Sequence, residues 1–194
     1  MSGIIYCYGD SNTWGFDPRG LMAYRYPEES RWVDILIKEG LPLVNGGMNG
    51  RTIPVYEGEK RLLLNTLDRF RPKAMSVMLG TNDLLTDPRR RPEDVAASMD
   101  TMLDMVQNAY PKLGILLIAP VPVEVAQWDA DKKSGRLSLL YERIANRRGI
   151  RFADAAEWKI PLSFDGVHFT EEGHRTFARK AGQFFTEDAF LINE

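Results

Sequence analysis

The chain has 194 residues, a length that suits one domain with a sizeable hydrophobic core. Its formal net charge of -2 gives no reason to expect binding to nucleic acid or to an anionic membrane. A single cysteine, Cys7, excludes an internal disulfide, and no apolar run is long enough to span a bilayer. No basic segment followed by an apolar one opens the sequence, so we expect a cytoplasmic protein with one domain over residues 1–194.

Five near-continuous apolar runs predict buried β-strands, at residues 4–8, 41–45, 74–79, 113–119 and 150–153. Segments with helical periodicity separate them, at 27–38, 57–70, 92–110 and around Leu137, and a last helix begins near Thr170, a good N-cap. Such strands, alternating with helices, favour a parallel sheet covered on both faces. With right-handed crossovers, the predicted fold is α/β, a three-layer α/β/α sandwich around a five-stranded parallel sheet.

Several segments are predicted to take no part in chemistry. We expect Cys7 to be a buried, inert thiol inside the first strand. Residues 124–135 are expected to form a mobile connection, and the three arginines at 89–91 a solvated loop before a helix. His174 is expected on a surface helix, as a bystander.

The stretch 6–15, Tyr-Cys-Tyr-Gly-Asp-Ser-Asn-Thr-Trp-Gly, takes the first strand into a tight turn. A small hydroxyl, that of Ser11, follows Gly9 within two residues. A turn fixed by a sheet is a suitable place for an exposed nucleophile. The same geometry presents backbone N–H groups to phosphates in nucleotide-binding folds, and an ordinary polar turn is a third interpretation. The local stretch does not decide among them.

A second group of candidates comes late in the chain, in Phe-Asp-Gly-Val-His-Phe-Thr at 164–170, before the last helix. Asp165 precedes His168 by three residues, and Gly166 between them lets the loop turn. A carboxylate on the Nδ1–H of a histidine fixes its tautomer and leaves Nε2 free as a base. Together with Ser11, the pair supplies a nucleophile, an acid and a base in the order Ser, Asp, His.

A serine that attacks a carbonyl also requires hydrogen-bond donors for the developing oxyanion. The backbone N–H groups of Ser11 and Gly50 and the side-chain amide of Asn82 are candidates, because all three residues lie just past predicted strand ends. In isolation, Gly50 is also compatible with a flexible turn, and Asn82 with a helix cap or an Asx-turn. The parallel sheet is expected to gather these positions in one crevice.

These segments resemble the four ordered blocks of the SGNH (GDSL) hydrolases. The matching residues are Gly9-Asp10-Ser11-Asn12, Asn45 with Gly50 and Thr52, Gly80-Thr81-Asn82-Asp83, and Asp165 with His168. The resemblance implies a flavodoxin-like fold, with Ser11 as nucleophile, His168 as base and Asp165 as its orienting acid. It also implies an oxyanion hole of Ser11, Gly50 and Asn82, with no cofactor and no metal. Asn12 departs from the leucine of the GDSL label, at a position that varies in the family.

Within the family, the blocks look most like those of bacterial arylesterases, a group that includes enzymes with acyltransferase and perhydrolase side activity. We therefore expect a serine esterase that acts on small-molecule esters with short acyl or aryl groups, through an acyl-serine intermediate. Carbohydrate acetylesterase, thioesterase and lysophospholipase activities stay open as alternatives. The balance of hydrolysis and acyl transfer, and the formation of a homo-oligomer, also stay open.

Residues that flank the strand-end loops are candidates for contact with the substrate. Asp10 lies in the first block, and an apolar wall is expected from Trp14, Phe16, Val121, Val123 and Trp128. Each apolar side chain is also compatible with ordinary packing. A small site lined by aromatic side chains favours short acyl chains.

Two other classes of protein are compatible with parts of the pattern. A metallophosphoesterase could use Asp10, Asn82, Asp83 and His168, but dinuclear sites draw on several histidines and this chain has two. A non-catalytic nucleotide- or sugar-binding module accounts for the glycine-rich turns. It leaves Asp165 and His168 unexplained, and the first loop lacks both G-x-G-x-x-G and a P-loop lysine.

Overall fold

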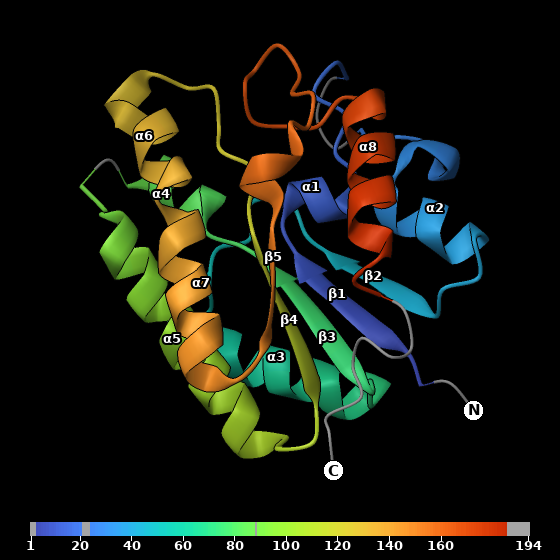
Figure 1. Ribbon diagram of the computed structural model, residues 1–194, viewed down its shortest axis with the longest axis vertical. Helices are drawn as coiled ribbons and strands as arrows, with labels where there is room; N and C mark the ends of the chain where they lie inside the picture. The colour runs from blue at the N-terminus through green and yellow to red at the C-terminus, as the bar shows by residue number, and fades with distance from the viewer. Residues whose placement is uncertain (1–2, 21–23, 88, 186–194) are drawn as a thin grey trace.

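The computed structural model describes residues 3–20, 24–87 and 89–185. A parallel sheet of five strands in the order β2-β1-β3-β4-β5 forms its centre (Figure 1). The strands are β1 (Ile5–Gly9), β2 (Leu43–Gly47), β3 (Ala74–Met78), β4 (Gly114–Ala119) and β5 (Arg151–Asp154). All five predicted strands are confirmed, with ends displaced by two residues or fewer.

Helices cover both faces of the sheet. They are α1 (Ser11–Trp14), α2 (Trp32–Lys38), α3 (Glu57–Phe70), α4 (Thr81–Thr86), α5 (Pro92–Ala109), α6 (Ala130–Gly135), α7 (Leu137–Arg148) and α8 (Glu171–Gly182). Short 3₁₀ turns lie at η1 (Glu28–Ser30), η2 (Gln127–Asp129) and η3 (Ala155–Trp158). None of the helices in the described residues is long and apolar enough to cross a membrane.

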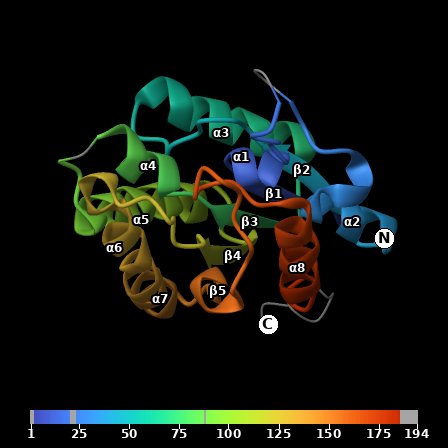
Figure 2. The same cartoon turned by 90° about the horizontal axis from the view of Figure 1, so that it is seen from above.

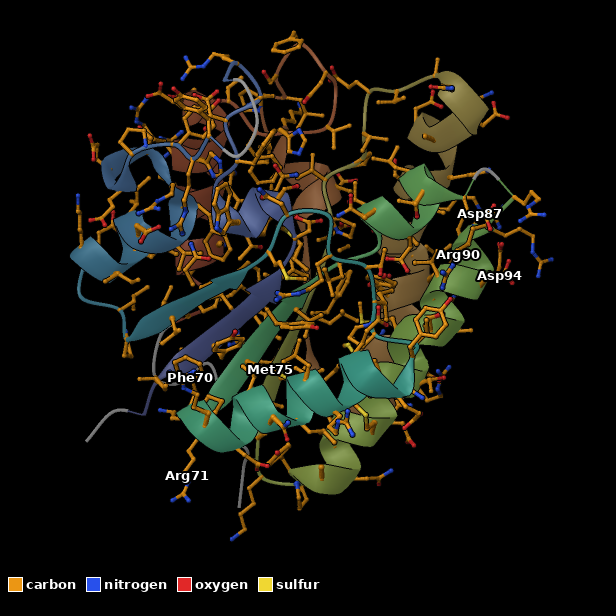
Figure 3. The ribbon with its side chains drawn as sticks, turned by 180° about the vertical axis from the view of Figure 1, so that it is seen from behind. Phe70, Arg71, Met75, Asp87, Arg90 and Asp94 are labelled. Atoms are coloured by element: carbon orange, nitrogen blue, oxygen red, sulfur yellow. The ribbon has the colours of Figure 1, made fainter. Side chains whose placement is uncertain are left out.

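Two separate cores stabilise the sandwich, one on each face of the sheet. Figure 2 shows the sheet from above, between the helices that cover it. On one face, Met75 and Leu117 pack with α3, α5 and α7. Figure 3, seen from behind, shows α3 lying across this face, with Phe70 at its end and Met75 behind it. On the other face, Cys7 and Ile118 pack with α2 and α8. Because alternate residues of each strand point to opposite faces, both faces of every central strand must be apolar, and this is the three-layer α/β/α arrangement expected.

The predictions about peripheral segments differ in outcome. Residues 124–135 contain η2 and α6, which were not expected, and the mobility of this segment stays a prediction. His174 lies on α8 as expected but has 0% exposure, between the rings of Tyr26 and Phe169 at 5.4 and 5.3 Å. The three arginines at 89–91 lie in a loop before α5, as predicted, with Arg89 and Arg91 exposed. Only the Arg90 guanidinium (Figure 3) turns inward, where it donates to the Ser98 hydroxyl at 2.7 Å. Helix packing therefore withdraws polar side chains that the sequence assigns to solvent.

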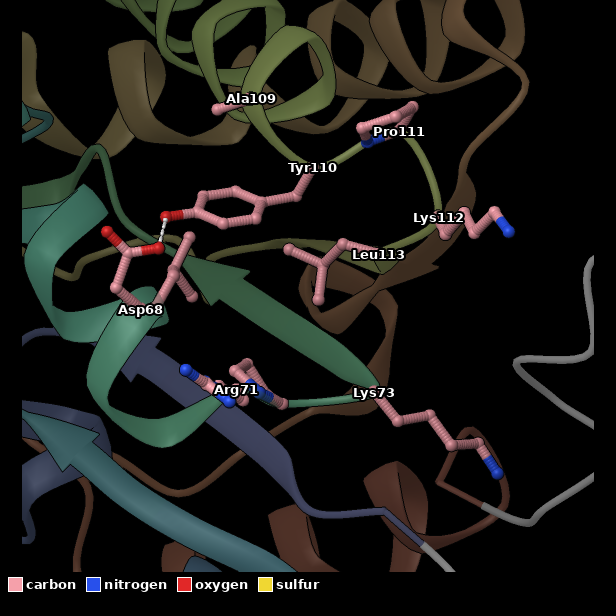
Figure 4. Close-up of a pocket in the computed structure, with 10 residues that line it drawn as sticks. Asp68, Arg71, Lys73, Ala109, Tyr110, Pro111, Lys112 and Leu113 are labelled. Atoms are coloured by element: carbon pink, nitrogen blue, oxygen red, sulfur yellow. Dashed lines mark hydrogen bonds between the residues drawn. The ribbon is translucent and has the colours of Figure 1, made fainter.

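The two ends of the sheet differ in what they carry. At the amino-terminal ends of β3 and β4, a hollow of about 500 Å³ is lined by Leu67, Tyr110 and Leu113, with Arg71 and Lys112 at its rim (Figure 4). At the opposite ends, the carboxyl ends of β1, β2 and β3 lie side by side, and α1 and the segment between β5 and α8 lie above them (Figure 1). The chain leaves β1 for β2 on one side and then crosses to β3 on the other. In open parallel sheets, ligands bind at such a switch point.

Candidate active site

Ser11 is the first residue of α1, immediately above the carboxyl end of β1. The turn is tight, since a Cβ at Gly9 would lie 2.0 Å from Thr13 Oγ1, so only glycine is accommodated there. The Asp10 carboxylate caps the short helix by accepting from Asn12 N–H at 2.9 Å. The helix ends at Gly15, which has a φ of 95°. Strand, cap and glycine together fix the backbone that carries the Ser11 hydroxyl.

The three residues predicted as nucleophile, base and acid form one hydrogen-bonded series. His168 Nε2 lies 3.0 Å from Ser11 Oγ, and His168 Nδ1 lies 2.6 Å from Asp165 Oδ2. The other carboxylate oxygen, Asp165 Oδ1, accepts from the backbone N–H groups of Val167 and His168, each at 3.0 Å. Asp165 therefore both closes the loop and orients the imidazole ring.

Glycine is required at residue 166 for the loop to form. Gly166 has a φ of 67°, and a Cβ there would lie 2.7 Å from the carbonyl oxygen of Glu124. The Gly166 carbonyl accepts from Glu124 N–H at 2.7 Å. These contacts hold the loop against the segment that follows β4.

The carboxyl groups of the site have shifted pKa values. Burial acts to raise the pKa of Asp165, but the hydrogen bonds from the His168 ring and from the His168 and Val167 N–H groups outweigh it, so its pKa lies below the ordinary range. Burial raises the pKa of Asp10 to about 6, against the lowering effects of the Asn12 N–H, His168 and Arg51. Asp165 is thus the carboxylate held ionised beside the histidine.

The three proposed oxyanion donors lie on neighbouring strand-end segments. Gly50, with a φ of 71°, lies in the loop after β2, and this loop is joined to β1 by Met48 N–H donating to the Gly9 carbonyl at 3.1 Å. Asn82 lies in the first turn of α4, and its Nδ2 donates to the Arg51 carbonyl at 3.0 Å. An amide NH₂ has two hydrogens, so one donor of Asn82 is left for a ligand. Among the described residues, the N–H groups of Ser11 and Gly50 donate to no protein acceptor.

Arg51 is a residue of this region that the sequence analysis missed. Its guanidinium donates to the Gly9 carbonyl at 2.8 Å and to the Gly46 carbonyl, and lies 4.2 Å from the centre of the Tyr8 ring. The Arg51 side chain thus joins the carboxyl ends of β1 and β2. The backbone carbonyl of Arg51 accepts the hydrogen bond from the Asn82 side chain. The Gly-Arg-Thr order was visible in the sequence, but the acceptors are backbone carbonyls that no sequence motif identifies.

Asp83, next to Asn82, gives a second connection to the Gly50 loop. Its side chain is fully buried, and Oδ2 accepts from Ile53 N–H at 3.1 Å. Oδ1 lies 3.6 Å from the Arg90 guanidinium. Burial raises the pKa of this carboxyl, and the Ile53 N–H and Arg90 partly offset the rise. Asp83 therefore joins α4 to the segment that follows Gly50.

The predicted substrate-contact residues are placed differently from one another. The Phe16 ring lies 4.6 Å from the His168 ring, and the half-buried Trp14 carries the Arg25 guanidinium over its ring at 5.1 Å. Val121 and Val123 do not share these contacts and line a hollow of about 420 Å³, with Ile160 and Leu162.

For all six candidates, including Asp10 and Trp128, a contact with substrate stays a prediction. Asp10 is buried, and its observed contact is the helix cap. Trp128 lies in η2, and its side chain is outside the described part of the structure.

The described residues contain no cluster of three or more His, Cys, Asp or Glu side chains that could hold a metal ion.

Residues 7–176 match the model of the GDSL-like lipase/acylhydrolase family. The chain belongs to this family. The match covers all four blocks and confirms the resemblance to SGNH (GDSL) hydrolases drawn from them. This GDSL-like hydrolase has no match among curated protein sequences.

Solved structures are similar to this GDSL-like hydrolase over nearly the whole chain. A candidate arylesterase from Agrobacterium tumefaciens str. C58 is 27% identical, with a TM-score of 0.80 over 93% of this chain and 97% of that chain. A carbohydrate acetylesterase family member from Sinorhizobium meliloti is 25% identical, with a TM-score of 0.80 over 93% and 96%. The native aryl esterase of M. smegmatis, at 24% identity, has the same fold, with a TM-score of 0.82 over 93% and 97%. The protein is a carboxylic ester hydrolase with the SGNH fold.

Proposed function

We propose that this hydrolase cleaves short-chain acyl and aryl esters through an acyl-serine intermediate on Ser11. The observation that carries the proposal is the series Ser11 Oγ, His168 Nε2, Nδ1 and Asp165 Oδ2, with separations of 3.0 and 2.6 Å. Both distances are hydrogen-bond distances, and the strong contact to Asp165 places the ring proton on Nδ1. Nε2 is then free to accept the proton of the serine hydroxyl.

The reaction has two stages. In the first, Ser11 Oγ attacks the ester carbonyl while His168 Nε2 takes the hydroxyl proton, and the imidazolium then protonates the departing alcohol. In the second, His168 removes a proton from water as the water oxygen attacks the acyl carbonyl. The bond from the acyl carbon to Ser11 Oγ then breaks, and the imidazolium returns the proton to Ser11 Oγ as the acid leaves. The negative charge on the carbonyl oxygen is met in both stages by the N–H groups of Ser11 and Gly50 and the Asn82 amide.

Two features of the site support a preference for small, flat or short groups. The Phe16 ring against His168 gives an aromatic surface beside the reacting atoms. A hollow of about 330 Å³ adjoins Gly50 and is lined by Tyr8, Met48 and Leu62. We therefore expect turnover of p-nitrophenyl esters to fall steeply from acetate to octanoate, and a rise with chain length would contradict the proposed preference.

The decisive experiment measures p-nitrophenyl acetate turnover by wild type and Ser11→Ala, with intact-mass detection of a phosphonate adduct. Turnover lost in Ser11→Ala, with one adduct on wild-type Ser11, would support the mechanism. Ser138→Ala, on α7, is the matched control and should keep both turnover and adduct. A folded wild type without turnover or adduct would refute the proposal and favour a binding module.

Sugar acetates are a second substrate class, because one similar structure is described as a carbohydrate acetylesterase family member. Acetate release from acetylated xylose, compared with p-nitrophenyl acetate on the same enzyme, would rank the two classes. Adding a primary alcohol to the same assay would measure acyl transfer as the share of ester product formed in place of free acid.

A further inference from the structure

Asn12 stands where the family label has leucine, and the structure gives its side chain two specific partners. Its Nδ2 donates to the Val167 carbonyl at 3.0 Å, and its Oδ1 accepts from Phe169 N–H at 2.9 Å. Val167 and Phe169 are the residues immediately before and after His168. One buried amide therefore holds the backbone on both sides of the histidine.

We propose that Asn12 is a positioning residue that fixes His168 Nε2 against Ser11 Oγ, an inference that rests on the proposed function. Asn12 is adjacent to Ser11 in α1, whereas the His168 loop comes more than 150 residues later. The two hydrogen bonds thus tie the element that carries the proposed nucleophile directly to the loop that carries the base.

The frame from which the Asn12 side chain extends is itself fixed. Its backbone N–H donates to Asp10 Oδ1 at 2.9 Å, and its carbonyl accepts from the indole N–H of the buried Trp32 at 3.1 Å. Both backbone groups of Asn12 are therefore engaged, and the position from which its side chain extends is fixed. The His168 loop takes its position relative to Ser11 from this fixed frame.

Other contacts of the loop do not replace this connection. The Asp165 carboxylate accepts from backbone N–H groups of the same loop. Within the loop, Ser163 N–H also donates to the His168 carbonyl at 2.7 Å. Gly166 joins the loop to Glu124. These bonds fix the internal shape of the loop and its distance from residue 124, whereas the Asn12 bonds fix its distance from α1.

Only a side-chain amide of this length supplies both the donor for the Val167 carbonyl and the acceptor for the Phe169 N–H. A carboxylate lacks the donor that the Val167 carbonyl requires, and a leucine of similar size lacks donor and acceptor. In Asn12→Leu the buried Phe169 N–H would lose its acceptor, so the loop would shift to find another partner. A displacement of about 1 Å between reacting groups can lower turnover by roughly 10²-fold.

The test compares wild type with Asn12→Leu, and with Asn12→Ser as a smaller polar replacement in case the leucine variant does not fold. Tyr110→Phe is the control, because it removes hydroxyl contacts with the Leu64 carbonyl at 3.0 Å and with Asp68 at 2.7 Å, at the other end of the sheet (Figure 4). The readouts are kcat and KM for p-nitrophenyl acetate, the melting temperature, and the downfield proton NMR signal of the His168 Nδ1–H bonded to Asp165.

We expect kcat to fall by about 10- to 10²-fold in both Asn12 variants, with KM changed less than threefold, and the downfield signal to shift or broaden. Tyr110→Phe should lower the melting temperature and leave kcat and the signal unchanged. Folded Asn12 variants with kcat within twofold of wild type and an unshifted signal would overturn the inference. If wild type shows no turnover, the proposed function fails, and the NMR signal alone still decides whether Asn12 positions His168.

Discussion

The Asp165 carboxylate has two roles, since it orients the His168 ring and holds the loop, and replacing it by asparagine would remove only the first. In the native structure Asp165 Oδ2 receives the proton on His168 Nδ1 at 2.6 Å, while Oδ1 accepts from two backbone N–H groups at 3.0 Å. An asparagine keeps one oxygen for the backbone groups and presents an NH₂ to the ring. His168 Nδ1 must then accept, which moves the ring proton to Nε2, facing Ser11.

The expected loss of turnover follows from this change in the tautomer of His168. With the proton on Nε2, which is 3.0 Å from Ser11 Oγ, the imidazole can donate to the hydroxyl but cannot take its proton. We expect kcat for p-nitrophenyl acetate to fall by roughly 10³–10⁴-fold, equivalent to about 4–5.5 kcal/mol of transition-state stabilisation. The melting temperature should change by a few degrees at most, because the backbone contacts of Oδ1 persist.

Initial rates and thermal unfolding of the same preparations provide the assay. Asp154→Asn is the matched control, because Asp154 also accepts a backbone N–H two residues later, that of Ala156 at 3.0 Å, at the end of the edge strand β5. The control should retain turnover. A folded Asp165→Asn enzyme within tenfold of wild-type kcat would refute the assignment of Asp165 as the orienting acid.

Three further predictions concern charge and hydrogen bonding around the site. Asn82→Ala should lower kcat by roughly 10²–10³-fold with little change in KM, since one amide N–H is left for the oxyanion; kcat within a few-fold of wild type would remove Asn82 from that role. Burial raises the pKa of Asp10 from 3.8 to about 6, so the fold loses stability as pH rises through that interval. Asp10→Asn should therefore raise the melting temperature relative to wild type at pH 8 and much less at pH 4. Equal shifts at both pH values would contradict a raised pKa for Asp10. Burial lowers the pKa of His174 from 6.5 to about 3, so stability present above pH 6.5 is lost as pH falls towards 3. His174→Leu should flatten the decline of melting temperature between pH 6 and pH 4, and an unchanged slope would count against this origin of acid lability.

Local signals were sufficient for most elements of the fold. The 57–70 helix was predicted to the residue, and Thr170 caps α8 by accepting from Gly173 N–H at 2.9 Å. Pro92 begins α5, where its missing N–H costs no hydrogen bond. Each of these features depends on residues within a few positions of one another, and sequence periodicity reports such interactions directly.

The burial of His174 could also have been found in the sequence. Residue 174 shares the helical face of Phe177, Ala178 and Ala181, at spacings of three, four and seven residues, and all four are buried. The prediction of a surface position was wrong, because this spacing places residue 174 on the inward face of the helix. Neither ring nitrogen has a hydrogen-bond partner among the described residues, so burial favours the neutral ring.

The sequence also determined that Ser11, Gly50 and Asn82 follow strand ends, because the carboxyl ends of parallel strands share one edge of a sheet. How these segments are held together depends on contacts that form only in the folded chain. Arg51 reaches the carbonyls of Gly9 and Gly46, and Asn12 holds the backbone on both sides of His168. The partners in these contacts are backbone groups, which every residue type carries, so no pattern of side chains in the sequence can identify them.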